Sequence, residues 1–455
     1  MTDLRNARHL SVHDLRRRIN EGDVDTVIVA FTDAQGRLQG KRMQAAYFAE
    51  HVLDSGTEVP AYLLSVDVDM NIADRYDLSM TDRRDGEMRL LLDQQTIRLL
   101  MHQPGTVMVQ CDVVGSDEAP VAESPRAILK QQLEAAGKRG YAVVAGTELE
   151  FMAFHTSYDD AWNSRYRDLA PVSQYDGDYS IMSGGRVEPL LHAIRNTAYA
   201  AGIDIESVTA TRSPGQHGIT LCHGDVLTSA DNHAVLKTIA KEIAAQQGKS
   251  ITFMATYDER HASSCRIRLS LRSPDDGSTV FWKDDGRTAL CDAFVAGVLL
   301  TLYDFTLLYA PSINSYKRFA SGSLAPTTIA WGVDNRVSAI RVLGRDDAAR
   351  VENRAPGADA NPYLALAAMI AGGLYGIDHD LELGPALTGN AHSSEFSRIP
   401  CTLREARQAF STSQVARTVF GEEVVDHYIT LADLELAAFE AAVTDWELRR
   451  SFERM

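Results

Sequence analysis

Apolar runs in the first 115 residues predict a small domain of strands that is introduced by one helix. Ser11-Val12-His13-Asp14 has the form of an N-terminal helix cap, and the helix that follows is expected to end near Gly22. The β-branched run 26–32 predicts a strand, and turn residues at 33–36 lead into a second strand at 37–43. Further strands are expected at 62–68, 88–92 and 107–114.

The rest of the chain predicts a larger domain of strands and long helices. The run 115–120 is typical of a linker, and Pro125 stands where proline is favoured at the start of a helix, here 126–139. Further helices are expected at 188–202, 232–247, 290–309, 362–375 and 422–439. Further strands are expected at 142–154, 219–222, 250–255, 265–271 and 338–342. The pattern predicts an α+β protein with domains at 1–115 and 116–455.

Composition narrows the classes of partner that the protein can bind. At 455 residues the chain exceeds one ordinary domain, and its hydrophobic fraction of 45% is that of a soluble globular protein. Its formal net charge is −17, with 62 acidic and 45 basic residues, which argues against binding to nucleic acid or to an anionic membrane. A local basic pocket for phosphates is compatible with this charge.

Cysteine usage and the apolar stretches predict a cytoplasmic protein. The most apolar stretch, 289–311, is interrupted by Asp292 and Asp304, which favours a buried helix over a membrane span. The first five residues lack the apolar core of a secretion signal. Five cysteines are scattered without the CxxC spacing of a metal or redox site, and we expect reduced thiols at Cys111, Cys222, Cys265, Cys291 and Cys401.

Glu148 and Glu150 are the first candidates for chemistry. They alternate on a predicted strand, so both side chains point to one face, about 7 Å apart. Two carboxylates at that separation repel each other unless a cation or a guanidinium group lies between them. An acidic surface strand is the alternative, but the apolar residues on both sides, 143–144 and 151–152, favour a lined cavity.

Arginines form the second group of candidates. Arg350, Glu352 and Arg354 alternate on an extended segment, which suits an anionic substrate beside a cation and suits a ladder of salt bridges equally well. Because arginine is costly to bury without a partner, its placement near apolar segments indicates recognition of carboxylate or phosphate, with charged surface loops as the alternative. These further arginines are Arg318, Arg336 and Arg341. The sequence has no P-loop, no dinucleotide-binding glycine motif after a strand and no nucleophile elbow.

In their order and separation these segments resemble the glutamine synthetase family, class I type. The resemblance extends from about Ser11 to the last predicted helix. Within this family the chain looks similar to actinobacterial-type paralogues that join glutamate to amines. The matching motifs are Gly146-Thr147-Glu148-Leu149-Glu150-Phe151, Pro214-Gly215-Gln216, 248–254, Asn314-Ser315-Tyr316-Lys317-Arg318, Asn335-Arg336, 350–354 and Asn361-Pro362-Tyr363.

The resemblance implies a fold, an assembly and a reaction. It implies an N-terminal β-grasp domain, a catalytic domain whose antiparallel sheet forms a funnel flanked by helices, and a homo-oligomer of two stacked rings, a dodecamer in this family. ATP would phosphorylate the γ-carboxylate of glutamate, and ammonia or an amine would then attack. Magnesium ions would screen the phosphates. The partners implied are a small carboxylate and an amine.

Seven site residues carry over from the family. Glu148 and Glu352 match ligands of the nucleotide-side metal, and Glu150 matches a ligand of the other metal beside the substrate. The remaining matches are the glutamate-site arginines Arg318 and Arg354 and the phosphate-facing arginines Arg336 and Arg341.

Other family positions hold different residues. Arg266 and Arg268 stand where the family has His-x-His, whose first histidine is a metal ligand. Thr211 (or its neighbour Ala210) and Gly218 replace two ligand glutamates. Leu324 replaces the glutamate of the family's flap, the loop that shields the acyl-phosphate. Because a guanidinium group can bridge two carboxylates, Arg266 is expected within salt-bridge distance of Glu148 or Glu352. These replacements argue against binding of ATP with magnesium in the family's manner.

Three hypotheses follow. The first is altered ligase chemistry that joins glutamate, or a related acid, to an amine other than ammonia, with Arg266 and Arg268 supplying charge in place of metal. The second is an inactive paralogue that binds a small ligand or assembles with an active homologue as a regulatory or structural subunit. The third is a metal-independent transferase or lyase on the same fold.

Overall fold

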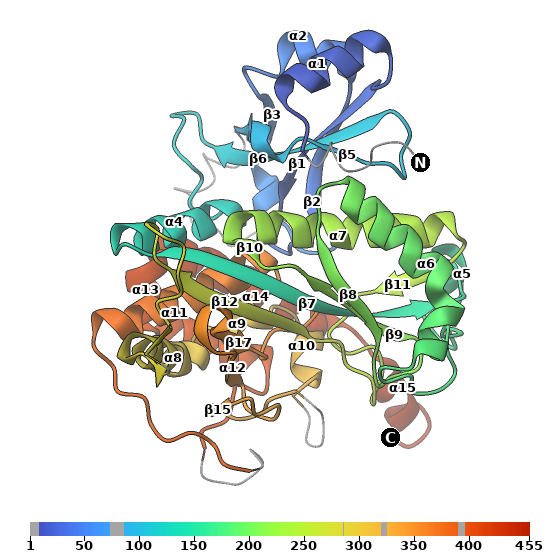
Figure 1. The fold of residues 1–455 in the computed structure, drawn as a ribbon. Helices are drawn as coiled ribbons and strands as arrows, with labels where there is room; N and C mark the ends of the chain where they lie inside the picture. The colour runs from blue at the N-terminus through green and yellow to red at the C-terminus, as the bar shows by residue number, and fades with distance from the viewer. Residues whose placement is uncertain (1–8, 73–85, 285, 320–324, 390–395) are drawn as a thin grey trace.

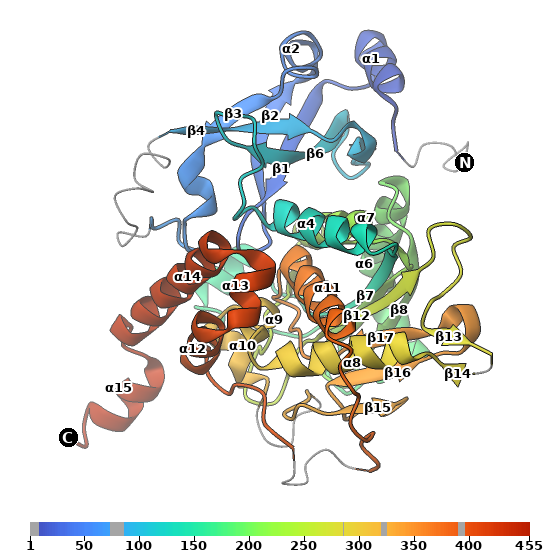
Figure 2. The ribbon, with the colours of Figure 1, turned by 90° about the vertical axis from the view of Figure 1, so that its left-hand side faces the viewer.

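Two large β-sheets, a separate two-stranded hairpin and the helices packed around them make up the described part of the molecule, as the computed structural model shows (Figures 1 and 2). The structure describes residues 9–72, 86–284, 286–319, 325–389 and 396–455. The predicted α+β class is confirmed. The division at residue 115 stays a prediction. Within the described ranges no helix combines the length and the apolarity that a bilayer crossing requires.

The N-terminal sheet has the strand order β2-β1-β6-β4-β3, with β5 paired to β6. Strands β1 and β6 run parallel, and the other neighbours are antiparallel. Helices α1 (Val12–Glu21) and α2 (Ala45–His51) lie at the outer end of this domain (Figure 2). The strands are β1 (Thr26–Thr32), β2 (Leu38–Gln44), β3 (Thr57–Pro60), β4 (Glu87–Leu92), β5 (Arg98–Leu99) and β6 (Thr106–Val114).

Local signals explain the first elements of this domain. Ser11 caps α1, its hydroxyl accepting the Asp14 backbone N–H at 3.1 Å, and Gly22 ends the helix in the left-handed conformation. Strand β1 is apolar on both faces because Val27, Val29 and Phe31 belong to the core of this domain, whereas Ile28 and Ala30 pack into the core of the larger one.

The larger sheet has the order β15-β16-β17-β12-β7-β9-β8, with β10 and β11 also paired to β7. All neighbouring strands are antiparallel except β15 and β16. The long strand β7 (Ala142–Phe154) crosses the middle of the domain (Figure 1). The other strands are β8 (Ile205–Ala210), β9 (Gln216–Leu221), β10 (Gly224–Asp225), β11 (Ser250–Thr252), β12 (Cys265–Arg272), β15 (Trp331–Val333), β16 (Ile340–Leu343) and β17 (Arg350–Asn353); β13 (Trp282–Lys283) and β14 (Gly286–Arg287) form a separate hairpin.

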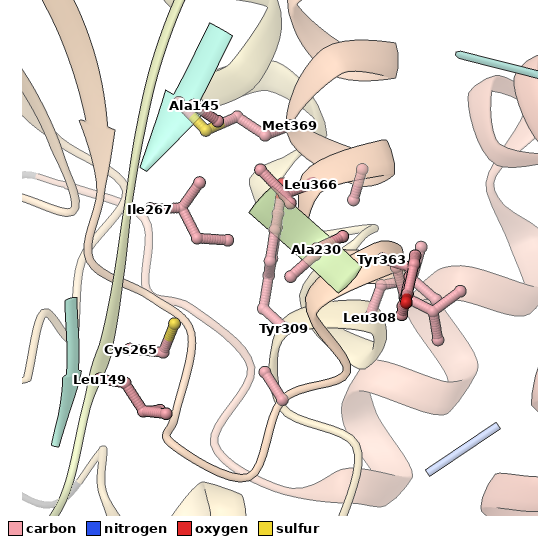
Figure 3. Packing of buried hydrophobic residues seen from close by; sticks show 14 of the residues in the cluster. Ala145, Leu149, Ala230, Cys265, Ile267, Leu308, Tyr309, Tyr363, Leu366 and Met369 are labelled. Atoms are coloured by element: carbon pink, nitrogen blue, oxygen red, sulfur yellow. The ribbon is translucent and has the colours of Figure 1, made fainter. Parts of the chain in front are cut away.

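Helices bury one face of this sheet. Inward side chains of β7 and β12, such as Leu149 and Ile267, face Tyr309, Leu366 and Met369 on the helices (Figure 3). The helices of the larger domain are α4 (Pro125–Lys138), α5 (Tyr158–Asn163), α6 (Ile181–Ala200), α7 (Val226–Gln246), α8 (Ala289–Leu302), α9 (Thr306–Tyr309), α10 (Ile313–Lys317), α11 (Pro362–Asp378), α12 (Leu403–Thr412), α13 (Gln414–Phe420), α14 (Glu422–Ala441) and α15 (Asp445–Ser451). Because side chains alternate along a strand, the opposite face of β7 and β12 carries the charged residues.

Two predicted elements are wrong. The expected strand at 62–68 is replaced by a 3-10 turn, Ala61–Leu64, because a short apolar run does not distinguish a strand from a buried turn. The single helix expected at 290–309 is two helices. The Thr306 hydroxyl donates to the Leu302 carbonyl at 2.6 Å, at the end of α8, where it competes with the helical backbone hydrogen bond.

Candidate functional site

The strand register places the predicted site residues together. Arg266 of β12 lies opposite Glu148 of β7, and Arg268 lies opposite Glu352 of β17. Arg341 of β16 lies opposite Glu352 from the other side. Four neighbouring strands thus present alternating acidic and basic side chains on one face of the sheet. Antiparallel neighbours bring directly opposed side chains to within about 5 Å of each other, so these groups must pair or repel.

Arg266 and Arg268 bridge the carboxylates. The guanidinium group of Arg266 donates to Glu148 and, at 3.0 Å, to Oε1 of Glu150. That of Arg268 donates to the other oxygen of Glu148 and, through Nε at 3.1 Å, to Oε2 of Glu352. The expected salt bridge between Arg266 and Glu148 is confirmed. Two guanidinium groups therefore occupy the two gaps between three carboxylates.

Glu352 is the most enclosed member of this network, and its side chain is 0% exposed. Its Oε1 accepts Nη1 of Arg341 at 2.6 Å and Nη1 of Arg354 at 3.3 Å. Burial alone would raise the pKa of Glu352, but the positive charges of Arg341, Arg354 and Arg268 outweigh burial and lower that pKa to about 2. Glu352 is therefore ionised throughout the physiological pH range.

Arg318 is buried and holds the backbone beyond β17. Its guanidinium group donates to the carbonyl oxygens of Ala355 at 2.7 Å and Pro356 at 2.8 Å. Burial lowers the pKa of Arg318 to about 10. The side chain lines the cavity, but these bonds give it a local structural task, and its role in binding glutamate stays a prediction.

These residues line a cavity of about 1900 Å³. Eleven arginines and six carboxylates form its wall, although the chain as a whole is acidic. Arg336 is exposed on this wall, beside Asp334. The Asp334 carboxylate accepts a hydrogen bond from Nη2 of Arg341 at 2.6 Å.

Arg350 also lies on the cavity wall. Burial lowers the pKa of Arg350, and the positive charge of Arg268 lowers it further. The positive wall suits an anionic ligand.

The donor set does not fit the divalent cations that the family resemblance implies. Both oxygens of Glu148, Glu150 and Glu352 already accept N–H or O–H donors. The described residues contain no group of three His, Cys, Asp or Glu side chains arranged to hold a metal ion. The hydroxyl of Thr211 instead donates to the Gln216 side chain at 2.7 Å. Gly218 lies beside Glu150, since a Cβ there would be 3.8 Å from the Glu150 side chain. Because glycine has no side chain, this position offers no metal ligand.

Ser264 and Asp334 are site residues that the sequence reasoning missed. The backbone N–H and hydroxyl of Ser264 both donate to Oε2 of Glu150 at 2.7 Å. Ser264 precedes Arg266 by two residues but lies just before the predicted strand, so alternation pointed to its face of the sheet without indicating its contact with Glu150. Asp334 gave no such signal, since its partner Arg341 becomes its neighbour only through tertiary folding. Leu324 lies outside the described residues.

Comparisons with known proteins all point to one family. The sequence pattern described as glutamine synthetase, catalytic domain, matches residues 122–451. The chain is 50% identical over 446 residues to gamma-glutamylethanolamide synthetase GlnA4 of Streptomyces coelicolor, covering 98% of this chain and 96% of that protein. It is 34% identical over 444 residues to glutamate–isopropylamine ligase of a Pseudomonas species, covering 96% of each. A solved structure of a GmaS/ADP complex has a TM-score of 0.84 and 25% identity, covering 97% of this chain and 99% of that one.

Proposed function

The chain belongs to the glutamine synthetase family, and we propose that it joins the γ-carboxylate of glutamate to a small amine other than ammonia, using ATP. The observation that carries this proposal is the arginine-lined cavity beside Glu150, Arg341 and Arg354. The names of the similar proteins, a γ-glutamylethanolamide synthetase and a glutamate–isopropylamine ligase, support the reaction class.

The reaction requires two anions to meet. An oxygen of the γ-carboxylate attacks the terminal phosphorus of ATP, and the bond to the ADP oxygen breaks. The amine nitrogen then attacks the acyl carbon, the bond from that carbon to the bridging oxygen breaks, inorganic phosphate leaves with this oxygen, and the amine loses a proton. In our proposal Arg336 and Arg341 bind the phosphates, whereas Arg354 and Arg318 orient the glutamate. Guanidinium groups fixed in advance lower the repulsion between carboxylate and triphosphate.

The side chains beside Glu150 support an amine other than ammonia. A Cβ at Gly218 would make only ordinary contacts, at 3.5 Å from the Thr209 hydroxyl and 3.6 Å from Thr211. Thr209 and Thr211, which are small and uncharged, line the cavity on this side of Glu150. In our proposal they border the bound amine, and they add no negative charge that would attract an ammonium ion.

The test is product formation. The protein is incubated with glutamate, ATP and one amine at a time from a panel of ethanolamine, isopropylamine, putrescine and ammonium, with and without magnesium. Mass spectrometry then detects the γ-glutamyl amide, and ADP is measured in parallel. We expect the amide and ADP in equal amounts with at least one organic amine, and little product with ammonium. Product with ammonium alone, or with no amine of the panel, contradicts the proposal.

A second candidate function rests on the complete pairing of the site carboxylates. If those pairs are permanent, the chain is a ligand-binding or regulatory subunit that shares the stacked rings of an active homologue. Co-expression with such a homologue tests this candidate, because mixed rings would alter the activity of the homologue in proportion to their content of this chain. For the ligase function we propose a homo-oligomer of stacked rings, and for either function a location in the cytoplasm.

A further inference from the structure

The two guanidinium groups lie where positive charge is needed between the three carboxylates. Arg266 contacts Glu148 and Glu150, and Arg268 contacts Glu148 and Glu352. Each group bridges two carboxylates from different positions on the sheet, using separate nitrogens for each. Guanidinium groups that belong to the chain therefore neutralise the repulsion between the carboxylates, which a bound cation would otherwise neutralise.

A divalent cation has no suitable place in this arrangement. Magnesium requires several oxygen ligands in a nearly octahedral arrangement, and each carboxylate oxygen in the cluster already accepts a donor. A cation placed against Glu352 would also stand beside Arg268, Arg341 and Arg354, which repel it. To bind there, a cation would have to displace arginines that cannot lose their charge.

The cavity wall retains positive charge after these pairs are made. Its eleven arginines exceed its six carboxylates. Arg336 and Arg345 make no ion pair with any residue that the structure describes, and both are exposed on the wall. A planar guanidinium fork matches the oxygens of a phosphate group. The excess charge is therefore available to several adjacent phosphates.

We propose that Arg266 and Arg268 replace the divalent cations of this cavity, so that the site binds a triphosphate anion through arginine without a bridging metal ion. This inference rests on the proposed function, in which the triphosphate is ATP, and it names how that substrate is recognised. Binding of the anion is measurable without amine and without turnover, so the inference can fail while the ligase activity holds, and the reverse.

The first experiment measures binding to the full-length protein by calorimetry. ATP and inorganic tripolyphosphate are titrated in EDTA and again in excess magnesium. We expect the dissociation constant of each in EDTA to lie within about threefold of its value in magnesium, or below it. Arg336→Gln should weaken both by about tenfold. Binding of ATP only in the presence of magnesium overturns the inference.

The second experiment measures binding of manganese alone, from the electron paramagnetic resonance of the free ion. We expect wild-type protein to leave the signal unchanged at equimolar concentration. The double variant Arg266→His with Gly218→Glu supplies two metal donors beside Glu148 and Glu150, and it should gain manganese binding.

The control for this gain is Arg404→Glu, which changes net charge equally at an exposed ion pair with Glu440. It should behave like the wild type. If wild-type protein binds manganese and Glu148→Gln abolishes that binding, a metal site exists and the inference is wrong. This result needs no variant with new donors, so the test holds even if the double variant does not fold.

Discussion

Glu352→Gln removes the carboxylate that Arg268, Arg341 and Arg354 share. The change keeps the shape of the side chain, removes its charge and replaces one acceptor oxygen by an NH2 donor. In the folded protein the pKa of Glu352 is about 2, against an ordinary value of 4.5, because three arginines outweigh the effect of burial. A lowering of this size corresponds to about 3 kcal/mol of folding free energy at pH 7. No discount for solvent screening applies, since the side chain is 0% exposed.

The sign of the effect sets the pH range. Because the folded pKa is lowered, the stabilisation is fully present above the ordinary value of 4.5 and is lost as pH falls toward about 2. We expect the free energy of unfolding of Glu352→Gln to lie about 3 kcal/mol below that of the wild type at pH 7. The difference should shrink steadily below about pH 5, as the wild-type carboxylate takes up a proton.

Urea unfolding measures this difference, followed by tryptophan fluorescence at one protein concentration over a series of pH values. The control is Glu134→Gln, which removes a carboxylate from an exposed helical ion pair with Lys138. It should match the wild type within error. Equal stability of Glu352→Gln and wild type at pH 7, or a difference that does not change with pH, would refute the electrostatic account of the cluster.

Three further predictions concern the scaffold. Gly297→Ala should lower the free energy of unfolding by about 2 kcal/mol or more, because its Cβ would lie 2.2 Å from the Gly372 carbonyl oxygen where α8 meets α11. Gly184→Ala in α6 has open space around the new Cβ and should leave the melting temperature unchanged or raise it. Tyr363→Phe should cost about 1–2 kcal/mol by urea unfolding, since the Tyr363 hydroxyl donates to Asp231 at 2.6 Å; no loss would show that this bond adds nothing.

Much of the fold was predictable because its signals are local. The apolar run 142–154 predicts β7 with its observed bounds, and the cap at Ser11 and the glycine at Gly22 mark α1. The errors occurred where contacts other than the local apolar pattern decide the backbone conformation. The apolar run at 62–68 is not a strand, and the helix at 290–309 is interrupted where the Thr306 side chain competes for a backbone acceptor. The spacing of apolar residues reveals neither that a short run is a buried turn nor that a side chain competes for a backbone acceptor.

The sequence by itself determined which charged side chains share a face. Alternation along a strand places Glu148 with Glu150 and Arg266 with Arg268, and the family resemblance brings the two strands together. Tertiary structure alone decided how these groups pair. The register that puts β12 between β7 and β17 lets Arg268 join Glu148 to Glu352, and the extended backbone just before β12 places Ser264 beside Glu150. Strand register depends on interactions between distant segments, whereas alternation depends only on the geometry of one strand.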